Sequence, residues 1–219
     1  METYRSARAR YRRLRRRAVF EQIYTANLWG DSESRSGTGS GLAATERIRA
    51  GILSTIEHFA IRSIVDAPCG DFYWLSKLDL AQSLDWYLGL DIVPQLIAQN
   101  KQTWAQKGIS FELADLTKRV PPRADLILCR HLLIHLPFED CFHVLRNFQR
   151  SGSRYLMITN QPHIERNDEI LFTGSFRPVN LCLAPFNFPQ PVWSVDDSQG
   201  TERADAAVFD LSTLESLLT

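Results

Sequence analysis

The sequence predicts an α/β fold in which a mostly parallel sheet is covered by helices on both faces. Short and nearly continuous apolar runs recur through the middle of the chain, and helical stretches lie between most of them. Strands that are apolar along their whole length are typical of a parallel sheet buried on both faces. Their alternation with helices is typical of the doubly wound architecture. The 219 residues suffice for one such domain.

Five apolar runs are the predicted strands of the parallel part of the sheet. They are residues 61–66, 86–91, 109–113, 124–129 and 154–159. Two further runs, residues 192–195 and 206–209, are predicted to add a hairpin at the sheet edge. The clearest helices between the strands are residues 94–107 and 138–150, and another helix is expected over 42–59, where isoleucines recur at helical spacing.

Residues 1–41 are predicted to precede the main domain, which spans residues 42–219. Residues 3–27 hold good helix formers without proline or glycine. Eight arginines lie between Arg5 and Arg17. They form either a basic arm for phosphates or the solvated face of the helix, and the second interpretation is favoured. The Gly/Ser-rich residues 29–41 are either a flexible linker or a lid over a ligand.

The regular pattern stops between residues 160 and 191. This stretch contains prolines and also several phenylalanines. A long irregular segment within a compact domain is usually functional or disordered, and its aromatic content argues against disorder. We therefore expect residues 160–191 to form an ordered cap near the functional site.

Composition excludes several classes of protein. The formal net charge is zero, so the whole molecule has no electrostatic footprint for nucleic acid, and a nucleic-acid partner is not expected. The four cysteines, at positions 69, 129, 141 and 182, have no zinc spacing. They indicate reduced thiols in the cytoplasm. No apolar run approaches the length of a membrane span, and no metal site is predicted.

The candidate site follows from the ends of the predicted strands. In an open parallel sheet, ligands bind beyond the carboxyl ends of the strands, near the point where strand order reverses. Residues 66–71 follow the first strand, Asp91 ends the second, and Asp115 with Leu116 follows the third. Residues 129–131 end the fourth. These four strand ends are expected to meet in one crevice.

These strand ends resemble the class I S-adenosylmethionine-dependent methyltransferases. The run Val65-Asp66-Ala67-Pro68-Cys69-Gly70-Asp71 is similar to their first motif, and the spacing to Asp91 and Asp115 is similar too. The segment from Asp125 to Leu136 ends in the "HxxxHL" pattern common in these enzymes. The resemblance covers residues 40–160. Residues 24–41 and 160–191 also resemble an uncharacterised bacterial subfamily, which indicates no substrate.

The resemblance implies a Rossmann-like three-layer αβα sandwich. Its sheet would have seven strands, mostly parallel, with an antiparallel edge strand. The cofactor would be S-adenosylmethionine, which carries a cationic sulfonium and an amine but no phosphate. One glycine, Gly70, then suffices where the backbone passes the cofactor, and a phosphate-cradling glycine loop is unnecessary. The sequence departs from the family's Gly-x-Gly-x-Gly at Ala67, Pro68 and Cys69.

Each predicted cofactor contact has a chemical reason. Asp66 or Asp71 would face the amine of the cofactor. Asp91 would accept hydrogen bonds from the ribose hydroxyls, and Ile92 would pack on the adenine. The remaining predicted contacts are the Asp115 carboxylate and the Leu116 backbone N–H, both on the adenine edge, together with Cys129 and Arg130 at the end of the fourth strand. Arg130 could instead form only a salt bridge.

Two histidines are candidates for the general base that an oxygen acceptor requires. His131 is the first candidate because it lies nearer the strand end. His135, one helical turn later, could instead pack beneath the site. The two are spaced like metal ligands, but no third ligand is evident nearby. Candidate acceptor contacts are Trp29, Asn167, Arg177 and Asn180. Trp29 could instead fill the core, and the other three could tie loop backbone together.

The predicted activity is methyl transfer to an oxygen of a small molecule or glycan. A methyltransferase acting on RNA or protein is the first alternative, because the arginine arm could hold a macromolecule. A binding module that keeps the fold without catalysis is the second. The sequence does not name the acceptor or the oligomeric state.

Overall fold

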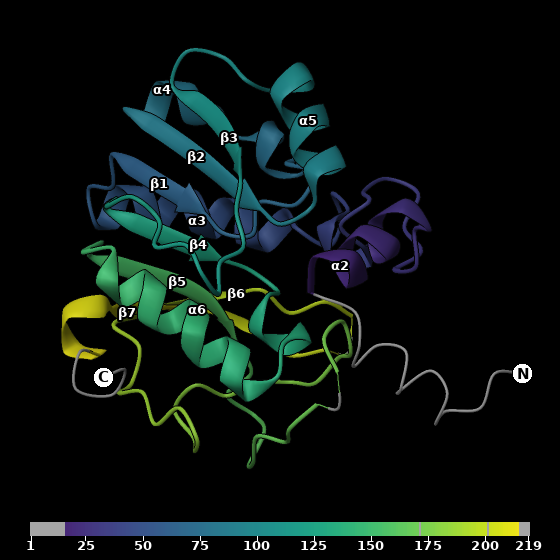
Figure 1. Ribbon diagram of the computed structural model, residues 1–219. Coiled ribbons are helices and arrows are strands. Elements are labelled where there is room, and N and C mark those ends of the chain that lie inside the picture. The colour runs from purple at the N-terminus through teal and green to yellow at the C-terminus, as the bar shows by residue number, and fades with distance from the viewer. Residues whose placement is uncertain (1–15, 171, 201, 215–219) are drawn as a thin grey trace, which may run out of the picture.

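The computed structural model describes residues 16–170, 172–200 and 202–214. Seven strands within this part of the chain form one sheet, in the order β3-β2-β1-β4-β5-β7-β6, with helices on both of its faces (Figure 1). The strands are β1 (Ser63–Asp66), β2 (Trp86–Asp91), β3 (Ile109–Leu113), β4 (Leu126–Cys129), β5 (Tyr155–Asn160), β6 (Trp193–Asp196) and β7 (Asp205–Asp210). The predicted three-layer fold is confirmed.

The directions of the strands confirm the edge hairpin. Strands β1 to β5 pair in parallel, whereas β7 pairs antiparallel with both β5 and β6. The reversed strand is therefore β7, one position inside the edge. Strand β6, at the edge itself, runs in the same direction as β1 to β5. This direction brings the carboxyl end of β6 to the same edge of the sheet as theirs.

The helices begin and end close to the predicted positions. They are α2 (Arg16–Thr25), α3 (Glu46–His58), α4 (Leu80–Ser83), α5 (Pro94–Thr103) and α6 (Phe138–Arg150). Helix α5 starts on Pro94, whose missing N–H costs nothing in the first turn. The predicted helix over 3–27 is described only from Arg16, and its first part lies outside the described residues. It ends before Asn27, which has a left-handed backbone (φ 48°).

The two faces of the sheet are covered differently. Helices α3, α4 and α5 pack on one face through buried side chains such as Ile52, Leu80 and Ile97. Helix α6 covers part of the other face through Val144 and Phe148. The rest of this second layer is the irregular segment 160–191, which contributes Val179, Leu181, Phe186 and Phe188 to the same buried cluster. In Figure 1 this segment runs on the α6 side of the sheet.

The strand order places the functional crevice. Successive strands wind outward from β1 in two directions, through β2 to β3 and through β4 to β5. The order therefore reverses between β1 and β4, and their carboxyl ends leave a crevice between them. Among the described residues, no helix is both long and apolar enough to cross a membrane.

Candidate functional site

A cavity of about 280 Å³ lies at the carboxyl ends of β1, β2 and β4. It is lined by side chains from these strand ends, from α2 and from residues 36–40. The predicted site residues that line it are Trp29, Asp66, Pro68, Cys69, Gly70, Asp91, Ile92, Arg130, His131 and His135. The structure thus brings together residues that the sequence assigned to the cofactor with both candidate bases.

Asp66 is a buried carboxyl at the end of β1. Its Oδ2 accepts a hydrogen bond of 2.6 Å from the Tyr87 hydroxyl. Burial raises the pKa of Asp66 to about 8, and the nearby Asp91 adds to the rise, although the Tyr87 hydrogen bond opposes it. A cation placed beside Asp66 would stabilise the ionised carboxylate, which burial disfavours.

Asp91 ends β2 and supports the loop that follows β1. Its Oδ2 accepts a hydrogen bond from the Gly70 N–H at 3.2 Å, and its Oδ1 accepts one from the Val93 N–H at 3.0 Å. Burial raises the pKa of Asp91 to about 6, against these backbone hydrogen bonds. Each carboxylate oxygen has capacity for a further hydrogen bond from a ligand hydroxyl.

The Gly/Ser-rich residues 30–41, here called the lid, are anchored by Asp71. The Oδ2 of Asp71 accepts hydrogen bonds from the Ser34 hydroxyl and the Arg35 N–H, both at 2.9 Å. The Asp71 N–H donates to the Ser36 hydroxyl at 2.9 Å. Asp71 does not line the cavity. Its carboxylate binds the lid and does not face the space where the amine of a cofactor would lie.

Two glycines allow the lid to pack closely on the site. Gly70 has a left-handed backbone (φ 52°), and a Cβ there would collide with the Ser36 hydroxyl. A Cβ on Gly39 would lie 2.9 Å from the His131 ring. The lid backbone therefore rests directly on the loop after β1 and on one candidate base. The segment therefore forms part of the cavity wall, and its role as a lid stays a prediction.

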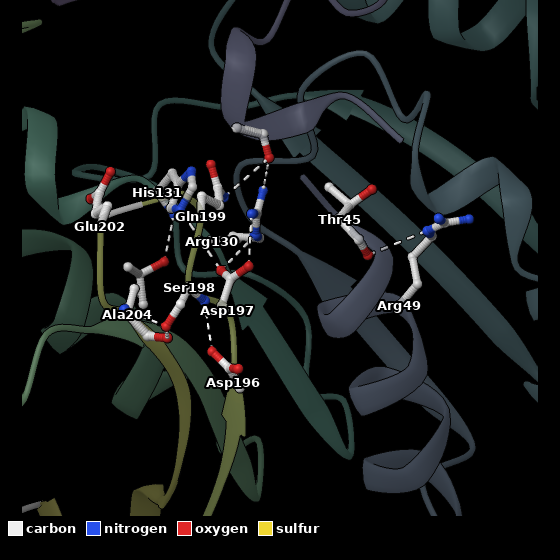
Figure 2. Close-up of polar contacts among 12 residues, drawn as sticks. Thr45, Arg49, Arg130, His131, Asp196, Asp197, Ser198, Gln199, Glu202 and Ala204 are labelled. Atoms are coloured by element: carbon white, nitrogen blue, oxygen red, sulfur yellow. Dashed lines mark hydrogen bonds and ion pairs between the residues drawn. The ribbon is translucent and has the colours of Figure 1, made fainter. Parts of the chain in front are cut away.

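Asp197 is a site residue that the sequence reasoning missed. It follows β6 and is buried, and it forms two hydrogen bonds of 2.8 Å with the Arg130 guanidinium. Arg130 also donates to the Gly39 carbonyl at 2.8 Å, so the ion pair holds the lid (Figure 2). Burial raises the pKa of Asp197, while Arg130 opposes the rise.

A sequence signal for Asp197 did exist. The rule that ligands bind beyond the carboxyl ends of parallel strands also applies to the predicted strand 192–195, if that strand runs with the others. Strand β6 does run in the same direction as the others, and Asp196 and Asp197 stand at its carboxyl end. Arg130 forms a salt bridge, which was its alternative predicted role. This salt bridge is buried.

The structure places Asp115 outside the cavity. Its Oδ2 lies 3.5 Å from the Arg16 guanidinium of α2, which also pairs with Asp140 at 2.7 Å. Burial alone would raise the pKa of Asp115, but the Thr117 hydroxyl and the Arg16 charge hold it below its ordinary value. The carboxylate that was assigned to the adenine is thus paired with a helix from the N-terminal segment.

His131 is held at the end of β4 in a constrained position. Its backbone is left-handed (φ 55°), which is uncommon outside glycine. Its N–H donates to the Thr159 hydroxyl at 2.9 Å. The ring Nε2 lies 3.7 Å from Asp197 Oδ2. Burial, together with the neighbouring Arg130 charge, lowers the pKa of His131 well below its ordinary value, so the ring is neutral at pH 7.

His135 is oriented by a hydrogen bond to the backbone. Its Nδ1 lies 2.9 Å from the Ser175 carbonyl, which can only accept, so Nδ1 carries the proton. Burial lowers the pKa of His135 and keeps the ring neutral at pH 7. In this tautomer Nε2 is an unprotonated acceptor. Chemically, this is the state that a general base requires.

The predicted acceptor residues Asn167, Arg177 and Asn180 do not line the cavity. The Asn167 amide donates to the carbonyls of Asn180 and Ala184, and its Oδ1 accepts from the Asn180 N–H. Arg177 donates to the Leu136 carbonyl at 2.7 Å. All three are buried, and their contacts are those of the alternative interpretation, in which they tie loop backbone together.

Three other predicted cofactor residues do not line the cavity. Ala67, Leu116 and Cys129 are buried in the apolar layer around α6. For Leu116, the predicted contact was its backbone N–H, which does not require the side chain to face the cavity. Within the described residues, no group of three or more histidine, cysteine or acidic side chains could hold a metal ion.

Comparison with protein-family models and with curated proteins finds no match. Solved structures do match. Magnesium protoporphyrin IX methyltransferase from Synechocystis PCC 6803 with bound S-adenosylmethionine is 15% identical, with a TM-score of 0.57 over 89% of this chain and 96% of that chain. N-methyltransferase NodS from Bradyrhizobium japonicum WM9 is 16% identical, with a TM-score of 0.58 over 77% and 96%.

Human N-acetylserotonin methyltransferase in complex with S-adenosylmethionine is also similar, at 16% identity and a TM-score of 0.56, over 76% of this chain and 52% of that chain. At such low identities the likeness concerns the fold. The order and directions of the seven strands agree with it. The chain therefore has the fold of the class I S-adenosylmethionine-dependent methyltransferases, as the motif resemblance implied.

Proposed function

We propose that the protein is an S-adenosylmethionine-dependent methyltransferase acting on an oxygen of a small molecule or glycan. The observation that carries the proposal is the cavity itself. It joins two buried carboxyls, Asp66 and Asp91, with two neutral histidines, His131 and His135. The matching structures crystallised with S-adenosylmethionine support the choice of cofactor.

The residues of the cavity fit this cofactor chemically. Asp66 would bind the amine directly or through water, because a cation relieves the cost of a buried carboxylate. Asp91 would accept hydrogen bonds from the ribose hydroxyls, and Ile92 would pack on the adenine. The loop after β1 passes close by with a single glycine, Gly70, which suits a cofactor without phosphates.

The chemistry requires alignment and removal of one proton. The bound cofactor would supply a methyl group on a positively charged sulfur, which is a good leaving group. Holding the acceptor in line with that methyl group accounts for up to roughly 7–11 kcal/mol in favourable cases. A neutral histidine would take the proton of the acceptor hydroxyl. The lid would exclude water, since its backbone packs on Gly70 and His131.

Titration calorimetry with S-adenosylhomocysteine tests the cofactor. We expect binding by the unaltered protein and much weaker binding by Asp91→Asn. Asp168→Asn is the matched control, because Asp168 is exposed and its carboxylate pairs with the similarly exposed Arg166 in the cap. A ligand at 100 times its Kd should stabilise the protein by about 2.7 kcal/mol. Absence of binding at millimolar ligand would refute the proposal.

Turnover on an acceptor panel separates the proposal from its alternatives. His131→Ala and His135→Ala should each be compared with the unaltered protein, and loss of the general base should lower the rate by roughly 10²–10⁴. Salt-sensitive activity on RNA or protein that requires residues 1–15 would favour a macromolecular acceptor. Cofactor binding without turnover of any acceptor would favour a binding module.

A further inference from the structure

Four aromatic rings that the proposed cofactor contacts do not use lie together in the cavity. They belong to Phe20 of α2, Trp29 before the lid, His135 after β4 and Phe176 of the cap. The rings of Trp29 and His135 are stacked, with centroids 4.9 Å apart and planes at 24°. Phe20 meets Trp29 edge-on at 6.4 Å, and Phe176 lies 6.2 Å from His135. We call these four residues the aromatic cluster.

Phe176 differs from the neighbouring phenylalanines of the same segment. Its side chain is 56% exposed, whereas Phe186 and Phe188 are 2% and 3% exposed. The buried pair packs on α6 and β7 and holds the second layer of the sheet together. Phe176 faces the cavity instead. A large apolar ring left open at a concave site is typical of a ligand contact.

The cluster is also poor in polar groups. Its four side chains carry only two polar groups that could face a ligand. These are the Trp29 indole N–H and Nε2 of His135. His135 is neutral because burial lowers its pKa. Its Nδ1 proton is committed to the Ser175 carbonyl, so Nε2 can only accept. The cluster therefore offers one hydrogen-bond donor and one acceptor surrounded by ring faces and edges.

We propose that the aromatic cluster is the acceptor subsite and that the acceptor is a planar aromatic compound carrying a hydroxyl group. This inference rests on the proposed methyltransferase function and narrows its substrate class. Ring–ring contacts with Trp29 and Phe176 would hold the acceptor. Its hydroxyl would donate a hydrogen bond to Nε2 of His135.

The same features disfavour a sugar. A glycan unit has hydroxyls around its ring, and each needs a partner when it is buried. A buried hydroxyl without a partner weakens binding by roughly five- to 150-fold, the equivalent of about 1–3 kcal/mol. Among the polar side chains that line the cavity, Arg130 already binds Asp197 and the Gly39 carbonyl. An aromatic alcohol needs only one polar partner.

The transfer step balances with these groups. The hydroxyl oxygen of the acceptor forms a bond to the methyl carbon supplied by the cofactor. The carbon–sulfur bond breaks, and its electron pair stays on sulfur, which becomes neutral. The hydroxyl proton moves to Nε2 of His135, which becomes a cation and later returns the proton to water. His135 would thus be the catalytic base, and the inference assigns His131 no proton.

The test begins with binding rather than turnover. Protein loaded with S-adenosylhomocysteine is titrated with 2-naphthol, with its saturated counterpart 2-decalol and with methyl glucoside, and binding is followed by saturation-transfer NMR on the probe. We expect 2-naphthol to bind more tightly than the other two. Trp29→Leu and Phe176→Leu should each weaken 2-naphthol binding by roughly two- to twelve-fold, the loss of one aromatic pair.

Phe142→Leu is the matched control. Phe142 contacts Phe186 outside the cavity, so this variant should bind 2-naphthol as the unaltered protein does. Binding of S-adenosylhomocysteine should be unchanged in all three variants. With S-adenosylmethionine, His135→Gln should bind 2-naphthol but form the methyl ether roughly 10²–10⁴ times more slowly. It should also lose the acid limb of the pH–rate profile.

The possible failures are distinguishable. If S-adenosylhomocysteine does not bind, the proposed function is wrong and the acceptor inference falls with it. If it binds, but 2-naphthol binds no better than 2-decalol or methyl glucoside, only the aromatic subsite is overturned. The same holds if Trp29→Leu and Phe176→Leu leave 2-naphthol binding intact. Full methylation by His135→Gln would overturn the assignment of the base.

Discussion

The lid (residues 30–41) and the cap (residues 160–191) are both largely irregular, yet different forces hold them in place. The lid is attached through hydrogen bonds, from Ser34 and Arg35 to Asp71 and from Arg130 to the Gly39 carbonyl. The cap is attached by burial of apolar side chains such as Phe186, which packs between Phe138 and Phe142. The lid is fixed by polar contacts, whereas the cap combines a buried apolar core with buried hydrogen bonds such as the one from Arg177 to the Leu136 carbonyl.

This difference explains their separate roles. These hydrogen bonds of the lid are few and each contributes roughly 1.5–3 kcal/mol because one partner is charged, so we expect the segment to open locally without unfolding the domain. Burial of several phenylalanines contributes far more, and it can be undone only by exposing that layer of the sheet. The cap is therefore mainly structural, and only its part near Phe176 lines the cavity. The lid lines the cavity through residues 35–40.

The largest expected effect comes from breaking the cap. Phe186→Ala should destabilise the protein by about 3–5 kcal/mol, the usual cost of removing a buried phenylalanine. Phe176→Ala, in the same segment but exposed, should change the free energy of unfolding by less than about 0.5 kcal/mol. Urea denaturation measures both. Similar losses in the two variants would show that the cap is not divided into a core part and a cavity part.

The next effect concerns the ion pair that reaches the lid. Asp197→Asn leaves the Arg130 guanidinium buried without its counter-charge and should cost about 3–5 kcal/mol of stability. The adjacent Asp196 is the control, because its pair with Arg47 is exposed. Asp196→Asn should cost less than about 1 kcal/mol. If the two variants were equally stable, the Arg130–Asp197 pair would not be the anchor that its burial indicates.

The sequence predicted the fold and the convergence of three strand ends on one cavity, because both depend on local pattern. Apolar strands that alternate with helices define the sheet, and the ends of β1, β2 and β4 carry Asp66, Asp91 and His131 to one edge. Polar side chains that contact backbone far along the chain were harder to assign. Asp71 seemed available to a ligand, and nothing in its neighbourhood shows that Ser34 and Arg35 occupy it.

Long-range pairing also explains the other differences. Asp115 has the expected position after β3, but its partner Arg16 lies 99 residues earlier in the chain. The role of Asp197 depends on the direction of β6, which is set by pairing with β7. Asn167 and Asn180 are typical of ligand contacts and of loop structure alike, and only their partners distinguish the two uses. Such contacts have no signature in a single sequence.

The pH dependence of stability tests whether the lid excludes water from the Asp66 carboxyl. The pKa of Asp66 is raised to about 8 by burial, whereas an unfolded aspartate titrates near 3.9. The folded protein thus binds this proton more strongly, and stability without cofactor should fall as pH rises from about 4 to 8. The slope is at most about 1.4 kcal/mol per pH unit.

The difference in slope between the unaltered protein and Asp66→Asn from pH 7 to 8 isolates this group. Asp91, with a pKa of about 6, is already ionised there, and the two histidines of the cavity remain neutral. Urea denaturation at several pH values should show the slope in the unaltered protein and its loss in Asp66→Asn. Equal slopes in the two proteins would mean that Asp66 titrates normally.

Only a small change in global stability is expected from Asp71→Ala, and this variant sharpens the comparison most. It removes the acceptor for the Arg35 N–H and the Ser34 hydroxyl, while the apolar contacts of the cap stay intact. We expect the free energy of unfolding to change by less than about 1 kcal/mol. Hydrogen exchange at Arg35 should nevertheless accelerate by about tenfold or more, because hydrogen bonds to a charged group contribute roughly 1.5–3 kcal/mol locally.

Exchange in the cap serves as the internal reference for that variant. Amides such as the Leu181 N–H, which donates to Asn160, should keep the rates of the unaltered protein, and Asp168→Ala should leave both segments unchanged. An opened lid would also admit water to Asp66, so the stability slope between pH 7 and 8 should shrink in Asp71→Ala. If exchange rose in the cap as much as in the lid, the two segments would open as one unit. The polar anchor at Asp71 would then not control the lid separately.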